Sequence, residues 1–87
     1  MRNLFAKLVD VRLYEVNMWA DMSMEGRYDD STREWALKNA CEEMSKIKDD
    51  VKTLGNATSM DVIGMLGSRC AATYHETEKR LAECLNK

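Results

Sequence analysis

The sequence predicts an all-α protein, a three-helix bundle with helices at about 3–22, 32–54 and 59–85. None of its 87 residues is proline, and 45% are hydrophobic. Apolar residues recur at alternating intervals of three and four along three long stretches, which is the period of one helix face, whereas proline would interrupt helix interiors. At this length we expect one helical domain, 1–87.

In the first stretch, 3–22, the polar residues follow intervals of four and three and predict one narrow solvent-facing stripe: Asn3, Lys7, Asp10, Tyr14, Asn17 and Asp21. A strand over Val9–Leu13 is the alternative, but its alternation ends at Tyr14 while the helical spacing continues. Most other positions are apolar, and a bundle helix needs an apolar arc only slightly wider than 100°. We therefore expect apolar surface to remain uncovered on this helix, with room for completion by oligomerisation.

The second helix has the clearest start and stop signals. Ser31 is a candidate N-cap, with Glu34 three residues later as in a capping box, and Gly55-Asn56 is a candidate stop. Its predicted buried stripe is Leu37, Ala40, Met44, Ile47, Val51 and Leu54.

Thr58 or Ser59 is the expected cap of the third helix, and its stripe is Ile63, Leu66/Gly67, Cys70, Tyr74, Thr77, Leu81 and Cys84/Leu85. We expect this helix to be unbroken and its small residues Gly64, Gly67 and Ala71 to admit another helix closely. A break at Gly67-Ser68 is the alternative, because each glycine costs roughly 1 kcal/mol relative to alanine. The expected assembly is an antiparallel hairpin of the second and third helices with the first packed across it.

Charge and cysteine content limit the classes of partner. Lys and Arg number 13 against 15 Asp and Glu, for a net charge of −2, so we expect no nucleic acid partner. No apolar run reaches the ~18 residues of a membrane span, so we expect no membrane partner. The three cysteines have no C-x-x-C spacing, and charges interrupt any signal-peptide core, which together predict a cytoplasmic protein.

No motif indicates catalysis, a cofactor or a metal centre. The only histidine, His75, lies five residues from Cys70, which places the two on different helix faces. The glycines fit no phosphate-binding loop. We therefore predict no enzyme, no catalytic residues, no cofactor and no metal ligands.

The segment 21–29 resembles the start of an EF-hand calcium loop. Asp21, Ser23, Glu25 and Asp29 are the oxygen-bearing side chains, with a carbonyl from Arg27 and glycine at the sixth position. The twelfth position is a threonine where the family has a bidentate glutamate. A weak calcium- or ligand-binding helical module is therefore one alternative function.

Methionine and aromatic residues gather at the end of the first helix and in the following loop. Tyrosine, tryptophan and arginine dominate interface hot spots, and methionine suits adaptable contact surfaces. We expect Trp35 to be the more buried tryptophan. The acidic residues of this segment are expected to attract a basic patch on a partner: Asp21, Glu25, Asp29 and Asp30. The predicted partner-binding residues are Met18, Trp19, Met22, Met24, Arg27, Tyr28, Asp29 and Asp30.

The leading functional interpretation is a non-enzymatic protein–protein interaction module, a small adaptor or inhibitor that docks a larger protein through this surface. Small helical phage proteins that block host proteins share this profile. The main alternative is self-association as a structural homo-oligomer built on the apolar first helix.

Overall fold

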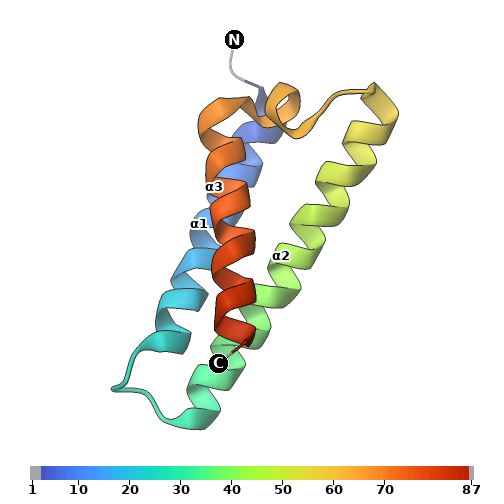
Figure 1. Cartoon of the computed structure of the whole chain (residues 1–87). Coiled ribbons are helices and arrows are strands. Elements are labelled where there is room, and N and C mark those ends of the chain that lie inside the picture. Colours follow the sequence, from blue (N-terminus) through green and yellow to red (C-terminus); the bar gives the residue numbers. More distant parts are fainter. Residues whose placement is uncertain (1–2, 87) are drawn as a thin grey trace.

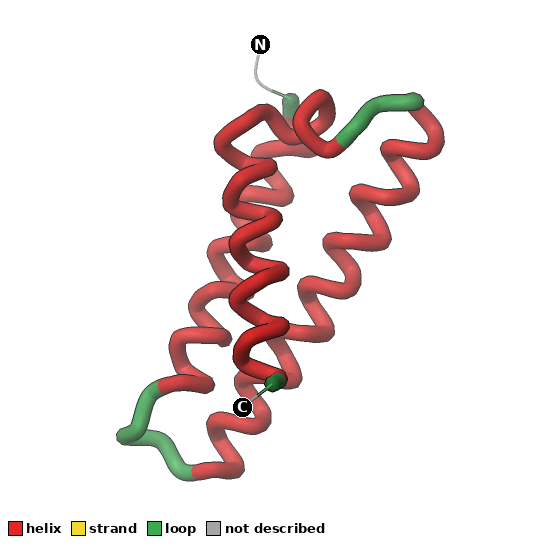
Figure 2. The backbone as a smooth tube through the Cα atoms, viewed as in Figure 1, coloured by secondary structure: helices red, strands yellow, loops and turns green. Residues whose placement is uncertain are grey.

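The computed structural model describes residues 3–86, which form three helices joined by two short connections (Figure 1). They are α1 (Leu4–Met24), α2 (Asp30–Thr58) and α3 (Val62–Leu85). The two connections lie at opposite ends of the molecule (Figure 2), so in this view the chain runs down, up and down again. The predicted all-α three-helix bundle is confirmed. None of the described helices combines the length and apolar character that crossing a membrane requires.

Asn3 starts α1 and also ties it to α3. Its side-chain oxygen accepts a hydrogen bond from the backbone N–H of Phe5 at 2.9 Å, which satisfies one free donor of the first turn. Its side-chain amide donates to the carbonyl of Met65, also at 2.9 Å. The helix ends at Met24, because Glu25 is extended and donates its backbone N–H to Met22.

The start and the stop of α2 both differ from the prediction. Asp29, not Ser31, is the N-cap, and its carboxylate accepts from the backbone N–H of Thr32 at 2.8 Å. The helix continues through Gly55 to Thr58 and ends where Ser59 takes the left-handed conformation, with φ 58°. A Cβ at Gly55 would lie 3.1 Å from the carbonyl oxygen of Met60, so this glycine permits a close approach and does not stop the helix.

The prediction of an unbroken third helix is wrong, and the alternative break at Gly67 is observed. Gly67 has φ 80° and ψ 162°, a conformation essentially restricted to glycine, and it kinks α3 after one turn. The expected small-residue contact surface is also absent at this position, since nothing lies within 4 Å of a Cβ built on Gly67. Because Ile63 precedes the kink, it leaves the predicted stripe and is 58% exposed.

Packing centres on α1, which makes more contact with each of the other helices than they make with each other. The antiparallel hairpin predicted for the second and third helices is present, but the C-terminal half of α2 leans away from α3 (Figure 1), so these two helices make less contact with each other than either makes with α1. The largest fully buried side chains are Val9, Leu13 and Val16 of α1, Ile47 of α2 and Thr77 of α3. The α2 stripe is confirmed, with its four central residues buried and Leu37 and Leu54 packed against the core.

The polar stripe of α1 faces α3 over part of its length, so the prediction that it faces solvent is wrong there. Asn17 donates its side-chain amide to the hydroxyl of Thr77 at 3.0 Å. Asp21 forms an ion pair with Arg80. The opposite flank of α1 is joined to α2 by Arg12, which bonds Glu43 at 3.0 Å and Asp50 at 2.7 Å. Because both flanks are occupied, the third side of α1 faces solvent.

Candidate partner-binding surface

A shallow hollow of about 670 Å³ lies where α1 ends, and we call it the methionine hollow. Five of the eight residues predicted for partner binding line it: Met18, Met22, Met24, Arg27 and Tyr28. Three further lining residues, absent from that prediction, are charged: Asp21, Glu25 and Arg80. The structure therefore brings most of the predicted residues together around one depression.

The loop after α1 holds Arg27 and Tyr28 against each other at the edge of the hollow. The backbone N–H of Tyr28 donates to the carbonyl of Glu25 at 3.3 Å, which turns the chain back. The Arg27 guanidinium lies 4.9 Å from the centre of the Tyr28 ring, a cation–π arrangement, and also donates to its hydroxyl at 3.0 Å. This pair gives the loop one aromatic face and one group of N–H donors.

Arg80 of α3 closes the opposite side of the hollow. Its guanidinium donates to the side-chain oxygen of Asn17 at 2.9 Å, pairs with Asp21, and approaches the Met24 sulfur at 3.8 Å. The Cys84 sulfur lies 3.8 Å from the same sulfur. The sequence analysis did not include Arg80 among the partner-binding residues. The available signal was the spacing of Thr77 and Arg80, which lie three residues apart and so share one face of the third helix.

The charges around the hollow balance each other. Asp21 pairs with Arg80, and Glu25 pairs with Arg27 at 3.1 Å. The apolar side chains remain accessible, since Met18 is 55% exposed and Met24 is 51% exposed. The hollow is therefore chemically suited to an apolar group with polar neighbours, more than to a strongly charged one.

Trp19 lies outside the hollow. It packs against the hydrophobic core and meets Trp35 edge to face, with ring centroids 5.0 Å apart and the planes at 83°. Trp35 is 52% exposed, so the prediction that Trp35 is the more buried tryptophan is wrong. The reason is that α1, and not α3, is the main neighbour of α2. Trp19 lies on the side of α1 that faces α2.

Asp29 and Asp30 also lie outside the hollow and serve the start of α2. Hydrogen bonds from Thr32 lower the pKa of the Asp29 carboxyl below its ordinary value. Asp30 forms an ion pair with Arg33 one turn along the helix. Both carboxylates are thus engaged in local structure at the rim of the loop.

A second apolar surface runs along α1 on the side that neither α2 nor α3 covers. We call it the outer face of α1, and its residues are all more than half exposed: Leu4, Leu8, Val11, Tyr14 and Met18. Only Met18 belongs to the surface predicted from the sequence. The excess of apolar residues on the first helix was the signal for it, but Tyr14 was assigned to the polar stripe.

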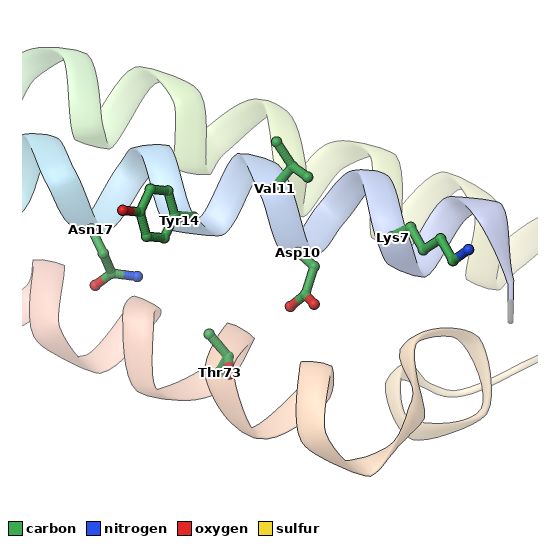
Figure 3. A pocket seen from close by; sticks show the side chains of 6 residues that line it. All are labelled: Lys7, Asp10, Val11, Tyr14, Asn17 and Thr73. Carbon is green, nitrogen blue, oxygen red and sulfur yellow. The ribbon is translucent and has the colours of Figure 1, made fainter.

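The groove between α1 and α3 borders this outer face. It is lined by Lys7, Asp10, Val11, Tyr14 and Asn17 of α1 and by Thr73 of α3 (Figure 3). In Figure 3 the side chains of Asp10 and Asn17 point toward α3, while Val11 points away from it. The polar residues thus form the inner wall of this groove and the apolar residues its outer edge.

The oxygen atoms of the EF-hand-like segment do not converge. Asp21 and Glu25 pair with arginines, the Ser23 hydroxyl donates to the carbonyl of Ala20 at 2.7 Å, and Asp29 caps α2. Within residues 3–86 no three His, Cys, Asp or Glu side chains are grouped as metal ligands would be. The side chains proposed for calcium are therefore used by the fold itself.

His75 and the cysteines occupy ordinary helical positions. The His75 ring lies 3.3 Å from a carboxylate oxygen of Glu78, on an exposed part of α3. Cys70 is buried, while Cys41 and Cys84 are half-buried, and none of the three forms a disulfide within residues 3–86. Burial raises the pKa of the Cys41 thiol, which reduces the fraction of reactive thiolate.

Comparison of this chain with protein-family models, with curated proteins and with solved structures found no match.

Proposed function

We propose that the chain is a non-enzymatic protein-binding module, a small adaptor or inhibitor, which docks a larger protein through the methionine hollow. The observation that carries this proposal is the accessibility of Met18 and Met24 beside the Arg27–Tyr28 pair. Methionine side chains are flexible and polarisable and can adapt to an incoming group. Arginine and tyrosine are the residues that contribute most often to interface hot spots.

The chemistry of the hollow defines the kind of partner segment. A large apolar side chain would contact the three methionines, while polar groups around it would meet the N–H donors of Arg27 and the hydroxyl of Tyr28. Because Asp21 and Glu25 already pair with arginines, we place the attraction in this apolar contact and not in acidic steering. The affinity should therefore depend only weakly on salt concentration.

The test compares two isosteric methionine substitutions. Met24→Gln replaces an apolar group in the hollow by a polar one of the same length, and Met60→Gln does so at a site 45% exposed on the α2–α3 connection. A protein captured from native cell extract is purified and titrated against all three chains. We expect Met24→Gln to weaken binding about fivefold or more, as for loss of a desolvated apolar contact, and Met60→Gln to bind as the wild type does.

Methyl resonances of the methionines give an independent readout. Met18, Met22 and Met24 report on the hollow, whereas Met44 and Met65 are buried in the core and serve as internal references. Shifts confined to the first three on titration would support the proposal. Equal affinity of the wild type and Met24→Gln, with no shift at the hollow, would overturn it.

A further inference from the structure

The exposed apolar residues of α1 form a pattern that is symmetric about Val11. Leu4 and Met18 lie seven residues before and after it, and Leu8 and Tyr14 lie three residues before and after it. At 1.5 Å per residue the row is about 21 Å long. Each of the five side chains is more than half exposed, so the row is accessible along its length.

We propose that the outer face of α1 binds a second copy of this chain, with the two α1 helices antiparallel and the two-fold axis passing beside Val11. In that arrangement each residue lies level with the residue equally far beyond Val11 in the other copy. Leu4 of one copy then lies level with Met18 of the other, and Leu8 lies level with Tyr14. The two Val11 side chains meet at the axis. All five apolar positions gain an apolar counterpart.

Charge selects the antiparallel orientation. Lys7 and Glu15 lie four residues before and after Val11, and both are exposed. Neither takes part in an ion pair within residues 3–86. The antiparallel dimer places Lys7 of each copy level with Glu15 of the other. A parallel dimer would instead place Lys7 beside Lys7 and Glu15 beside Glu15 of the second copy, and so juxtapose like charges.

The proposed interface consists of one helix from each copy, so we expect the dimer to be weak. Interfaces smaller than the typical value of about 800 Å² per partner are characteristic of weak or transient complexes, so for contact through a single helix face we expect a dissociation constant on the order of 10 µM. Met22, Met24 and Tyr28 lie beyond the end of the paired segment. Met18 belongs to both surfaces and is covered by Leu4 of the second copy in the dimer. The other residues of the methionine hollow stay accessible, and failure of one proposal does not entail failure of the other.

The first experiment is sedimentation velocity of the full chain over a range of concentrations around that value. Val11→Asp introduces two like charges at the axis and is expected to weaken dimerisation at least about fiftyfold, leaving a monomer. Ile63→Asp is the matched control, since Ile63 is similarly exposed but lies at the start of α3. Far-ultraviolet circular dichroism checks that both variants keep the helical content of the wild type, because neither position is buried.

The second experiment tests the orientation by reversing charges. Lys7→Glu and Glu15→Lys should each weaken the dimer about tenfold, because attraction becomes repulsion at two symmetric positions, and the double variant should restore wild-type affinity. In a parallel dimer the like-charge contacts would persist in every variant and no restoration would occur. A wild type that stays monomeric well above the expected dissociation constant, a dimer insensitive to Val11→Asp, or a double variant without restoration would overturn the proposal.

Discussion

The Arg80 guanidinium donates a hydrogen bond to the side-chain oxygen of Asn17, with 2.9 Å between Nη1 and Oδ1, and thereby joins α3 to α1. The same asparagine donates its amide to the Thr77 hydroxyl at 3.0 Å and to the Leu13 carbonyl at 2.9 Å. These groups form a partly buried polar contact along one flank of α1. The flank that carries the most polar residues of α1 is thus an interface between helices.

Arg80→Met should destabilise the fold by about 1–2 kcal/mol, because Asn17 and Asp21 lose a charged donor while the length of the apolar stem is retained. The free energy of unfolding is measured by urea denaturation at neutral pH. Arg69→Met is the control, since Arg69 is exposed and forms no ion pair within residues 3–86. Equal losses in the two variants would show that the Arg80 contacts contribute nothing specific.

Trp19→Ala should destabilise the fold more than Trp35→Ala does, because Trp19 packs against the core while half of Trp35 is exposed. We expect a loss of about 2–3 kcal/mol for Trp19, below that of a fully buried tryptophan, and roughly 1 kcal/mol for Trp35. Thermal and urea unfolding of both variants measures the difference. A larger loss of stability for Trp35→Ala than for Trp19→Ala would contradict this assignment, because it would mean that Trp35 is the tryptophan packed more closely against the core.

Helix faces could be predicted from the sequence because burial repeats with the helical period. The stripe of α2 from Ala40 to Val51 is buried as expected, and so are Cys70, Tyr74 and Leu81 of α3. The excess of apolar residues on the first helix also indicated uncovered surface, and Leu8 and Val11 are exposed. Local patterns suffice for such features because each depends on one helix at a time.

Features that depend on how the helices meet could not be predicted in this way. The sequence allows Asn17 and Asp21 to face either water or a polar partner, and only the approach of Arg80 decides between them. The same applies to the methionine hollow, which needs Arg80 from a helix more than fifty residues away. The kink at Gly67 follows from a local conformation that glycine permits but does not require.

Gly67→Ala should destabilise the fold by about 1–3 kcal/mol, because φ 80° with ψ 162° is strained for any residue that has a Cβ. Gly26→Ala is the matched control: nothing lies within 4 Å of its Cβ and its φ is outside the positive range, so we expect a change below about 0.5 kcal/mol. Urea denaturation measures both values. If Gly67→Ala leaves stability unchanged, α3 can straighten through this position at no cost.

The Asp29 cap should make part of the stability depend on pH. Hydrogen bonds from Thr32 lower the pKa of this carboxyl in the folded state below its ordinary value of 3.8. Because the folded-state pKa is the lower one, the unfolded chain binds the proton more readily, and the contribution is fully present above 3.8 and is lost as pH falls through the folded-state value. Asp29→Asn and Asp29→Ser keep a capping oxygen but do not titrate. The difference in free energy of unfolding between each variant and the wild type should therefore change only in that acidic range. Urea unfolding of the three chains between about pH 6 and about pH 2.5 measures this difference, and parallel profiles for all three would show that the cap does not link proton binding to folding.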